Sequence, residues 1–134
     1  MFCYQCEQTA RGEGCVKSGV CGKTPDVAAL QDVLIYSVMG LAQVAAEARK
    51  KGITDPEANR FTVKAMFSTL TNVNFDPDRF QPLITQAVEL RDMLKTKAQV
   101  SVTEGPATFT PAATVDDLVK QGEAVGLKSD LSIN

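Results

Sequence analysis

The chain has 134 residues, of which 44% are hydrophobic and 22% charged, the composition of an ordinary single globular domain. Fourteen basic and sixteen acidic side chains give a formal charge of −2, and the absence of a basic run argues against a nucleic-acid partner. A Ser/His/Asp triad is excluded because the chain has no histidine, and the longest apolar stretch is predicted to be too short and too interrupted to span a membrane.

All four cysteines lie within the first 21 residues, in the pattern Cys3-x2-Cys6-x8-Cys15-x5-Cys21. Four thiolates on one short loop, with no imidazole in the chain, predict a single soft-metal centre, and an iron–sulfur cluster is the favoured occupant. The short gap lets Cys3 and Cys6 project from the same side of a tight turn, while the rest of the loop presents Cys15 and Cys21 from the other side. We therefore expect residues 1–24 to form a cluster-binding loop.

The other residues of this loop suit such a centre. It is rich in glycine, which tolerates positive φ and close approach of the backbone to a bulky group. Arg11, Lys17 and Lys23 could offset the charge of an anionic centre, and the aromatic residues Phe2 and Tyr4 could shield it from water. Simple solvation of the basic side chains and ordinary packing of the aromatic ones explain the same pattern.

Three other interpretations of the cysteine pattern stay open. A structural Zn(Cys)4 site uses the same ligands but usually shows two short pairs, whereas five residues separate Cys15 from Cys21. A disulfide framework requires an oxidising compartment, yet the start Met1-Phe2-Cys3 shows no secretory signal, so we expect a cytoplasmic protein. Four unliganded thiols near an exposed terminus would be prone to oxidation.

Beyond the loop the sequence predicts helices. Thr24-Pro25-Asp26 combines a capping hydroxyl, a proline at the first helical position and an acid in the first turn. Apolar residues then recur at three- and four-residue spacing as far as Ala48, and Gly52 provides a stop. Together these signals predict one long helix of roughly 26 residues that begins at Pro25.

Two further helices have the same kind of start signal. Asp55-Pro56-Glu57 and Asp76-Pro77-Asp78 each precede an apolar stripe with helical spacing. Pro82 lies inside the second of these stripes. It predicts either a kink in the first turns or a later start of the main helix, because proline cannot donate a helical hydrogen bond.

The last part of the chain predicts a loop and a short fourth helix. Thr114 is positioned as its cap, and the helix is expected to stop near Gly126. Short connections between the longer helices favour antiparallel neighbours. We therefore predict an all-α antiparallel helical bundle of about three long helices plus a short fourth, preceded by the cysteine loop. Within one domain, residues 25–103 would form the three-helix bundle and residues 104–134 a linker and the fourth helix.

Five separated segments, taken in their order along the chain, resemble the opening of a known family of proteins. They are Met1-Phe2-Cys3-Tyr4-Gln5-Cys6-Glu7-Gln8-Thr9, Gly14-Cys15, Val20-Cys21-Gly22-Lys23-Thr24, Leu30-Gln31-Asp32 and Phe67-Ser68-Thr69-Leu70-Thr71-Asn72-Val73-Asn74-Phe75-Asp76. The family that they resemble is that of the hybrid-cluster proteins, also called prismane proteins or hydroxylamine reductases. The likeness covers essentially the whole chain and is loosest across residues 95–134.

The resemblance implies a helical N-terminal domain whose cysteines hold a simple cluster. In that family a subclass with short cysteine spacing carries [4Fe–4S], and a subclass with a longer gap before the third cysteine carries [2Fe–2S]. Cys3, Cys6, Cys15 and Cys21 match the short-spacing positions one for one. By resemblance they are therefore the metal ligands and the cofactor-binding residues of a [4Fe–4S] cluster.

The family's reaction is the reduction of hydroxylamine to ammonia and water, and reduction of nitric oxide is also proposed. It takes place at a second, hybrid iron–sulfur–oxygen cluster, held by one His, two Glu and four Cys much later in the chain. This sequence has no histidine and no cysteine after Cys21, so it cannot build that cluster. We expect an N-terminal piece of such an enzyme that is not catalytic by itself and has no catalytic residue.

The expected partners are the remainder of the parent enzyme and an external electron-donor protein, and a domain separated from its neighbours is expected to self-associate through an exposed apolar face. Two other functions stay open: a zinc-binding structural or interaction module, and a free-standing ferredoxin-like electron carrier. Bound iron and sulfide would distinguish both iron–sulfur functions from zinc. Because the cysteine loop shows no predicted secondary structure, we expect metal to order residues 1–23.

Overall fold

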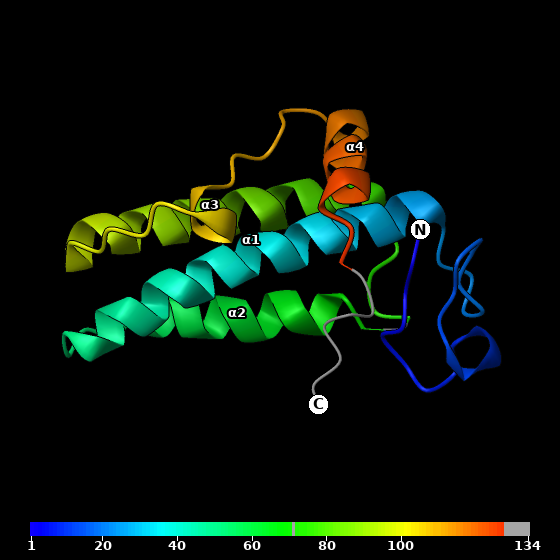
Figure 1. The fold of residues 1–134 in the computed structure, drawn as a ribbon, viewed down its shortest axis with the longest axis horizontal. Coiled ribbons are helices and arrows are strands. Elements are labelled where there is room, and N and C mark those ends of the chain that lie inside the picture. The colour runs from blue at the N-terminus through cyan, green and yellow to red at the C-terminus, as the bar shows by residue number, and fades with distance from the viewer. Residues whose placement is uncertain (71, 128–134) are drawn as a thin grey trace.

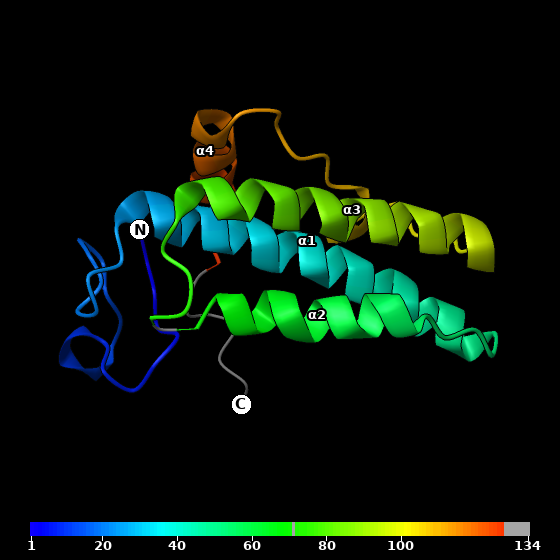
Figure 2. The same cartoon turned by 180° about the vertical axis from the view of Figure 1, so that it is seen from behind.

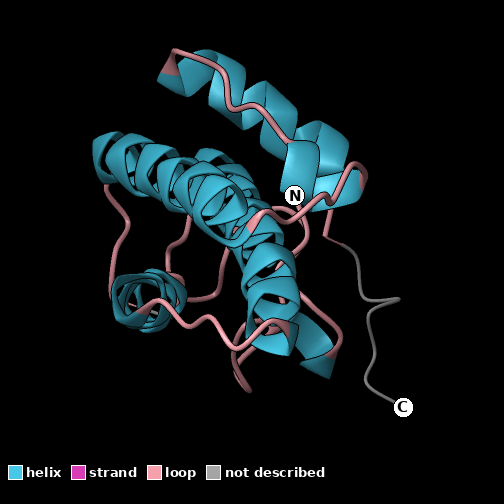
Figure 3. Cartoon of the chain, turned by 90° about the vertical axis from the view of Figure 1, so that its left-hand side faces the viewer, coloured by secondary structure: helices cyan, strands magenta, loops and turns pink. Residues whose placement is uncertain are grey.

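A computed structural model describes residues 1–70 and 72–127 of the chain. Its elements, in order, are η1 (Ala10–Gly12), α1 (Pro25–Lys50), α2 (Pro56–Ser68), α3 (Pro77–Ala98), η2 (Gly105–Thr108) and α4 (Val115–Val125). The described residues form only helices and loops (Figure 3), apart from one isolated bridge between Cys3 and Cys15. The predicted all-α fold with a short fourth helix is confirmed, whereas Thr71 and the predicted linker residues 128–134 lie outside the described part.

Each α-helix begins at the predicted residue because a side chain caps it. The Thr24 hydroxyl accepts a hydrogen bond from the Val27 N–H at 3.3 Å, and Thr114 does the same for α4. Asp55 and Asp76 cap α2 and α3, and a proline follows each of them at the first helical position. These contacts are local in sequence, which explains why sequence patterns predict the helix starts well.

Pro82 lies inside α3, which begins at Pro77, so the alternative of a later start is wrong. A proline at this position removes one helical hydrogen bond, whose acceptor would be the Asp78 carbonyl. Both residues are exposed, so water can solvate that carbonyl. The helix therefore tolerates this proline close to its solvent-facing start.

The three longer helices lie side by side, with α1 between α3 and α2 (Figures 1 and 2). Consecutive helices run in opposite directions, so α1 and α3 point the same way. Helix α4 lies across the start of α1, at the end of the bundle that carries the N-terminal loop (Figure 1). Helix α1 is thus the central element, and it packs against the three other α-helices and η2.

Helix α1 supplies more of the core than any other element. Fully buried side chains from every α-helix form one cluster, among them Leu30, Leu34, Leu41, Phe61, Phe80, Ile84 and Leu118. A smaller cluster at the other end of α1 joins α3 to the segment before η2. The division at residues 24 and 103 stays a prediction, although α4 shares the main cluster through Leu118.

Two glycines in helices allow other elements to approach closely. A Cβ at Gly122 of α4 would lie 2.1 Å from the carbonyl oxygen of Ala29 in α1. A Cβ at Gly40 of α1 would lie 2.3 Å from the carbonyl oxygen of Pro106 in η2. Real side chains do not come so close to backbone atoms, so both crossings depend on glycine.

By length and composition, α1 could cross a membrane, since the mean hydropathy of its most apolar window is 1.5. The prediction that no apolar stretch is long enough is therefore wrong for this helix. Its best window is 67% buried inside the structure. Packing against the other helices thus accounts for the apolar composition of α1, as for the central helix of a bundle.

One apolar face is left open on α2 and the loop that follows it. The exposed side chains spaced along it are Val63, Met66, Phe67, Leu70 and Val73. Val63 is 72% and Phe67 60% exposed, and residues four apart lie on one face of a helix. This observation agrees with the expectation that the chain exposes an apolar face.

Candidate metal centre

The N-terminal loop lies at one end of the bundle, beside the start of α1 and the loop that follows α2 (Figure 2). All four of its cysteines are free thiols in the structure. Cys15 is buried, and Cys3, Cys6 and Cys21 are partly buried. The chain thus places its four soft donor atoms in one loop at one end of the molecule.

Backbone pairing holds the first and third cysteines side by side. The Cys3 N–H donates to the Cys15 carbonyl at 3.0 Å, and the Cys15 N–H donates to the Cys3 carbonyl at 2.8 Å. Gly14 precedes this pair with φ +146°, and a Cβ there would come within 2.4 Å of the Phe2 ring. The sequence analysis did not predict this pairing. The run Gly14-Cys15 is the one sequence feature related to it, because the position before Cys15 has no room for a side chain.

Backbone groups also act on the buried thiol. Hydrogen bonds from the backbone at Ala10 and Val20 lower the pKa of Cys15, with a smaller contribution from the positive charge of Lys23. Backbone hydrogen bonds to sulfur stabilise the thiolate, which is the form that binds metals. Cys15 is therefore already in an environment suited to a metal ligand.

Lys23 is the second feature of this environment. Its side chain is only 1% exposed, and its Nζ donates to Gln31 Oε1 at 2.6 Å and approaches Cys3 Sγ at 3.3 Å. The Phe75 ring centroid lies 6.0 Å from the same nitrogen, within the range of a cation–π contact. A buried ammonium group therefore faces the first cysteine.

The three basic residues of the loop differ in their exposure to solvent. Arg11 and Lys17 are exposed, and Lys23 alone is buried against a cysteine. From the sequence, all three were candidates to offset the charge of the centre, and simple solvation was the alternative. Burial of Lys23 depends on Gln31 in α1 and Phe75 after α2, so a local pattern could not identify it.

Asp32 of α1 is the other charged group of this region. Burial raises the pKa of its carboxyl group from 3.8 to about 7, while the positive charge of Lys23 opposes the shift. Asp32 also lines a hollow of about 160 Å³ together with Phe2, Cys3 and Tyr4. This hollow is therefore bordered by the first cysteine and by a carboxyl group that holds its proton up to neutral pH.

The chemistry of these residues fits a cluster, whereas the arrangement of their side chains does not by itself form a metal site. Within residues 1–70 and 72–127, no three Cys, Asp or Glu side chains are arranged to hold one metal ion, so ligation by Cys3, Cys6, Cys15 and Cys21 stays a prediction. The chemistry of the donor set does fit an anionic metal–sulfur centre. The four free thiols share the loop with a backbone that favours thiolate at Cys15 and with a buried cation beside Cys3.

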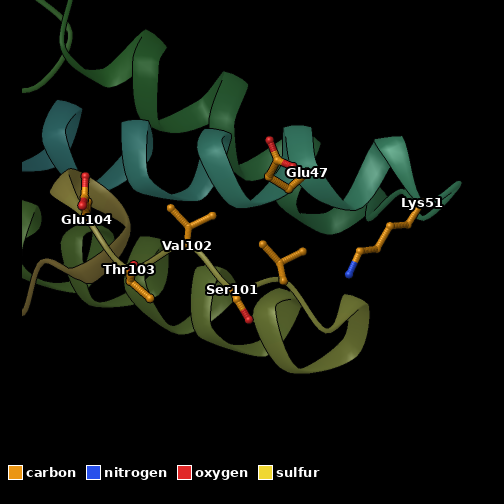
Figure 4. Close-up of a pocket in the computed structure, with 7 residues that line it drawn as sticks. Glu47, Lys51, Ser101, Val102, Thr103 and Glu104 are labelled. Carbon is orange, nitrogen blue, oxygen red and sulfur yellow. The ribbon is translucent and has the colours of Figure 1, made fainter.

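A larger hollow of about 320 Å³ lies at the far end of α1 (Figure 4). It is lined by Glu47 of α1, by Lys51, which directly follows α1, and by residues 100–104, whose side chains Figure 4 shows. Lys51 Nζ donates to the carbonyls of Ala98 and Gln99 and so ties the end of α3 to α1. Glu47 lies about 33 Å along α1 from Pro25, so this hollow is far from the cysteine loop.

The Prismane/CO dehydrogenase family matches residues 1–130 of this sequence. The chain belongs to that family. It is 59% identical to a hydroxylamine reductase of Syntrophobacter fumaroxidans, over 97% of this chain and 25% of the relative. A hydroxylamine reductase of Methanocella arvoryzae is 55% identical over 98% of this chain and 25% of the relative, and one of Rhodospirillum rubrum is 44% identical over 98% and 26%.

These relatives confirm the family resemblance that the sequence segments suggested. They also show that the chain spans about a quarter of the length of the curated relatives it matches. It therefore corresponds to part of a larger protein in this family. The Prismane family implies iron–sulfur clusters, and this chain has four cysteines.

Proposed function

We propose that this chain is the N-terminal electron-transfer domain of a hydroxylamine reductase-type oxidoreductase and that it holds one [4Fe–4S] cluster. The ligands would be the thiolates of Cys3, Cys6, Cys15 and Cys21. One observation carries the proposal: four free thiols share a single loop, and a buried ammonium lies 3.3 Å from the first of them. A positive charge beside a thiol favours the thiolate that metals bind.

When bound, such a cluster takes up and releases single electrons. The chain's own residues would hold the centre and adjust its surroundings. Backbone N–H groups stabilise negative charge on Cys15 Sγ, and Lys23 supplies a fixed positive charge beside Cys3. The rings of Phe2 and Tyr4 lie 5.4 Å apart and line the same hollow as Cys3, where they reduce the access of water.

The chemical step would take place in the part of the parent enzyme outside this chain. Reduction of one hydroxylamine to ammonia and water consumes two electrons and two protons, and reduction of nitric oxide is a further candidate reaction there. An external electron-donor protein would deliver electrons to this domain one at a time. We expect no hydroxylamine reduction by this chain alone, because it has no histidine and no cysteine after Cys21.

We also propose a cytoplasmic location. A reducing compartment keeps the four thiols available for metal, whereas an oxidising one converts such thiols to disulfides. All four cysteines are free in the structure, which supports this proposal. Finding the native protein in an oxidising compartment, with its cysteines paired, would contradict it.

Substitution of the cysteines tests the proposal. The anaerobic chain is reconstituted with iron and sulfide, and Cys3→Ser, Cys6→Ser, Cys15→Ser and Cys21→Ser are compared with Val20→Ser, which changes an exposed neighbour of Cys21. We expect about four irons and four sulfides in the wild type and in Val20→Ser. Each cysteine variant should hold a less stable or smaller cluster. Equal cluster content in all four cysteine variants would overturn the assignment of ligands.

A further inference from the structure

A buried lysine next to the cysteines takes part in none of the ion pairs among the described residues. This residue, Lys23, is 1% exposed. Removing an ammonium group from water without an opposite charge is strongly unfavourable. The Asp32 carboxyl group interacts electrostatically with Lys23, but burial raises its pKa to about 7, so it is only partly ionised at neutral pH. Asp32 therefore compensates the charge of Lys23 only in part.

The lysine is held in place at both ends. Its backbone carbonyl accepts a hydrogen bond from the Gly19 N–H at 2.8 Å, and a Cβ at Gly19 would come within 2.8 Å of the Lys23 Cβ. At the other end, Nζ donates to Gln31 Oε1 at 2.6 Å. Gln31 is itself buried, and among the described residues its Nε2 has no hydrogen-bond partner. Its amide is therefore oriented by the ammonium group.

The remaining acceptor of Lys23 is sulfur. Nζ lies 3.3 Å from Cys3 Sγ, and the Phe75 ring covers the ammonium group at 6.0 Å. This geometry suits a negatively charged sulfur, such as that of a metal–sulfur centre, because a charged donor bonds most strongly to a charged acceptor. Lys17 lies in the same loop but is exposed, so water screens its charge.

We infer that Lys23 is a positioning residue that sets the reduction potential of the centre held by the four cysteines, through its hydrogen bond to Cys3 Sγ. The inference rests on the proposed function. Each one-electron reduction adds one negative charge to the centre, and a buried positive charge nearby stabilises the reduced state more than the oxidised state. Hydrogen bonds to cluster sulfurs and burial are established means by which proteins shift such potentials. Lys23 therefore raises the potential.

The test is the midpoint potential of the reconstituted chain in wild type, Lys23→Met and Lys23→Arg, with Lys17→Met as the matched control. We expect Lys23→Met to lower the equilibrium ratio of reduced to oxidised centre at least tenfold, a shift of about 59 mV to more negative potential. Lys23→Arg keeps the charge and should restore most of this difference. Lys17→Met should change the equilibrium ratio of reduced to oxidised centre by less than about twofold from the wild-type value. Water screens the charge of Lys17, so its loss has little effect on the centre.

The outcomes separate this inference from the proposed function. A wild-type chain that binds iron and sulfide, together with a Lys23→Met chain of unchanged potential, would overturn the inference alone. A wild-type chain that binds no iron–sulfur centre would overturn both. If Lys23→Met cannot retain the centre, retention by Lys23→Arg supports a requirement for positive charge. Loss of the centre in both variants would show that Lys23 is needed to assemble the centre whatever charge replaces it, and would overturn the inference.

Discussion

The cysteine loop and the helical bundle are held together by different means. The bundle has a main core cluster to which every α-helix contributes, and each of its helices starts at a side-chain cap. The loop has η1, one backbone bridge and a few turn hydrogen bonds, and Cys15 is its one buried cysteine. The bundle is therefore expected to be stable without metal, and the loop to need its ligand. Four experiments test this difference between loop and bundle.

The largest effect is expected in the core. Phe80 of α3 is fully buried, so Phe80→Ala should lower the free energy of unfolding by about 3 to 5 kcal/mol. Phe67→Ala removes the same side chain from a position that is 60% exposed and should change it by less than about 1 kcal/mol. Chemical denaturation followed by circular dichroism measures both. Similar losses in the two variants would mean that the described core does not stabilise the bundle.

Removal of iron should act on the loop and leave the bundle folded. We expect amide protection in residues 1–23 to fall by more than about tenfold when a chelator removes the metal, because few hydrogen bonds remain to order them. Protection in α1 should change much less. Hydrogen exchange followed by mass spectrometry resolves the two regions. Unchanged loop protection in the metal-free chain would show that the loop's own hydrogen bonds order it without metal.

Asp32 should make the bundle's stability depend on pH. Burial raises its pKa from 3.8 to about 7, so the folded chain binds this proton more tightly than the unfolded chain does. The free energy of unfolding should therefore decrease as pH rises from about 4 to 7, since the folded state resists ionisation. Asp32→Asn should remove this decrease and stabilise the metal-free chain by about 1 to 2 kcal/mol at pH 8, allowing for partial exposure of the group.

Denaturation of Asp32→Asn at several pH values measures this effect. Glu89→Gln, which removes one negative charge from an exposed position of α3, is the control for net charge. A variant with the same slope between pH 4 and 7 as the wild type would contradict the account of Asp32.

The smallest effect concerns the exposed face of α2. We expect weak self-association of the isolated chain at concentrations of about 1 mM, because Val63 and Phe67 expose apolar surface side by side. Phe67→Lys should weaken it, whereas Met93→Lys, at a residue 65% exposed on α3, should have less effect. Sedimentation analysis over a range of concentrations measures the association. A strictly monomeric wild-type chain would contradict this expectation.

The same division between bundle and loop explains what the sequence could predict. Helix starts such as Thr24-Pro25-Asp26 depend on contacts between residues two or three apart, so the sequence pattern contains them. Four cysteines in one loop likewise identify the candidate ligands without any structure. The family resemblance added the cluster type, which remains a proposal.

Long-range contacts were beyond the reach of sequence patterns. The pairing of Cys3 with Cys15 joins residues twelve apart, and no periodic pattern in the sequence predicts it. Burial of Lys23 needs Gln31 and Phe75 from two other parts of the fold. The crossing of α4 over α1 depends on Gly122. From sequence alone, a glycine at this position indicates only a low helix propensity and not a close contact between helices. In each case tertiary packing, not local preference, determines the contact.

The most direct test of the central claim is the content of iron, acid-labile sulfide and zinc per chain after anaerobic purification, together with visible and EPR spectra. We predict about four irons and four sulfides, with a spectrum that changes reversibly on one-electron reduction. One zinc without sulfide, persisting after reconstitution with iron and sulfide, would contradict the account. The chain would then be a zinc-binding structural module.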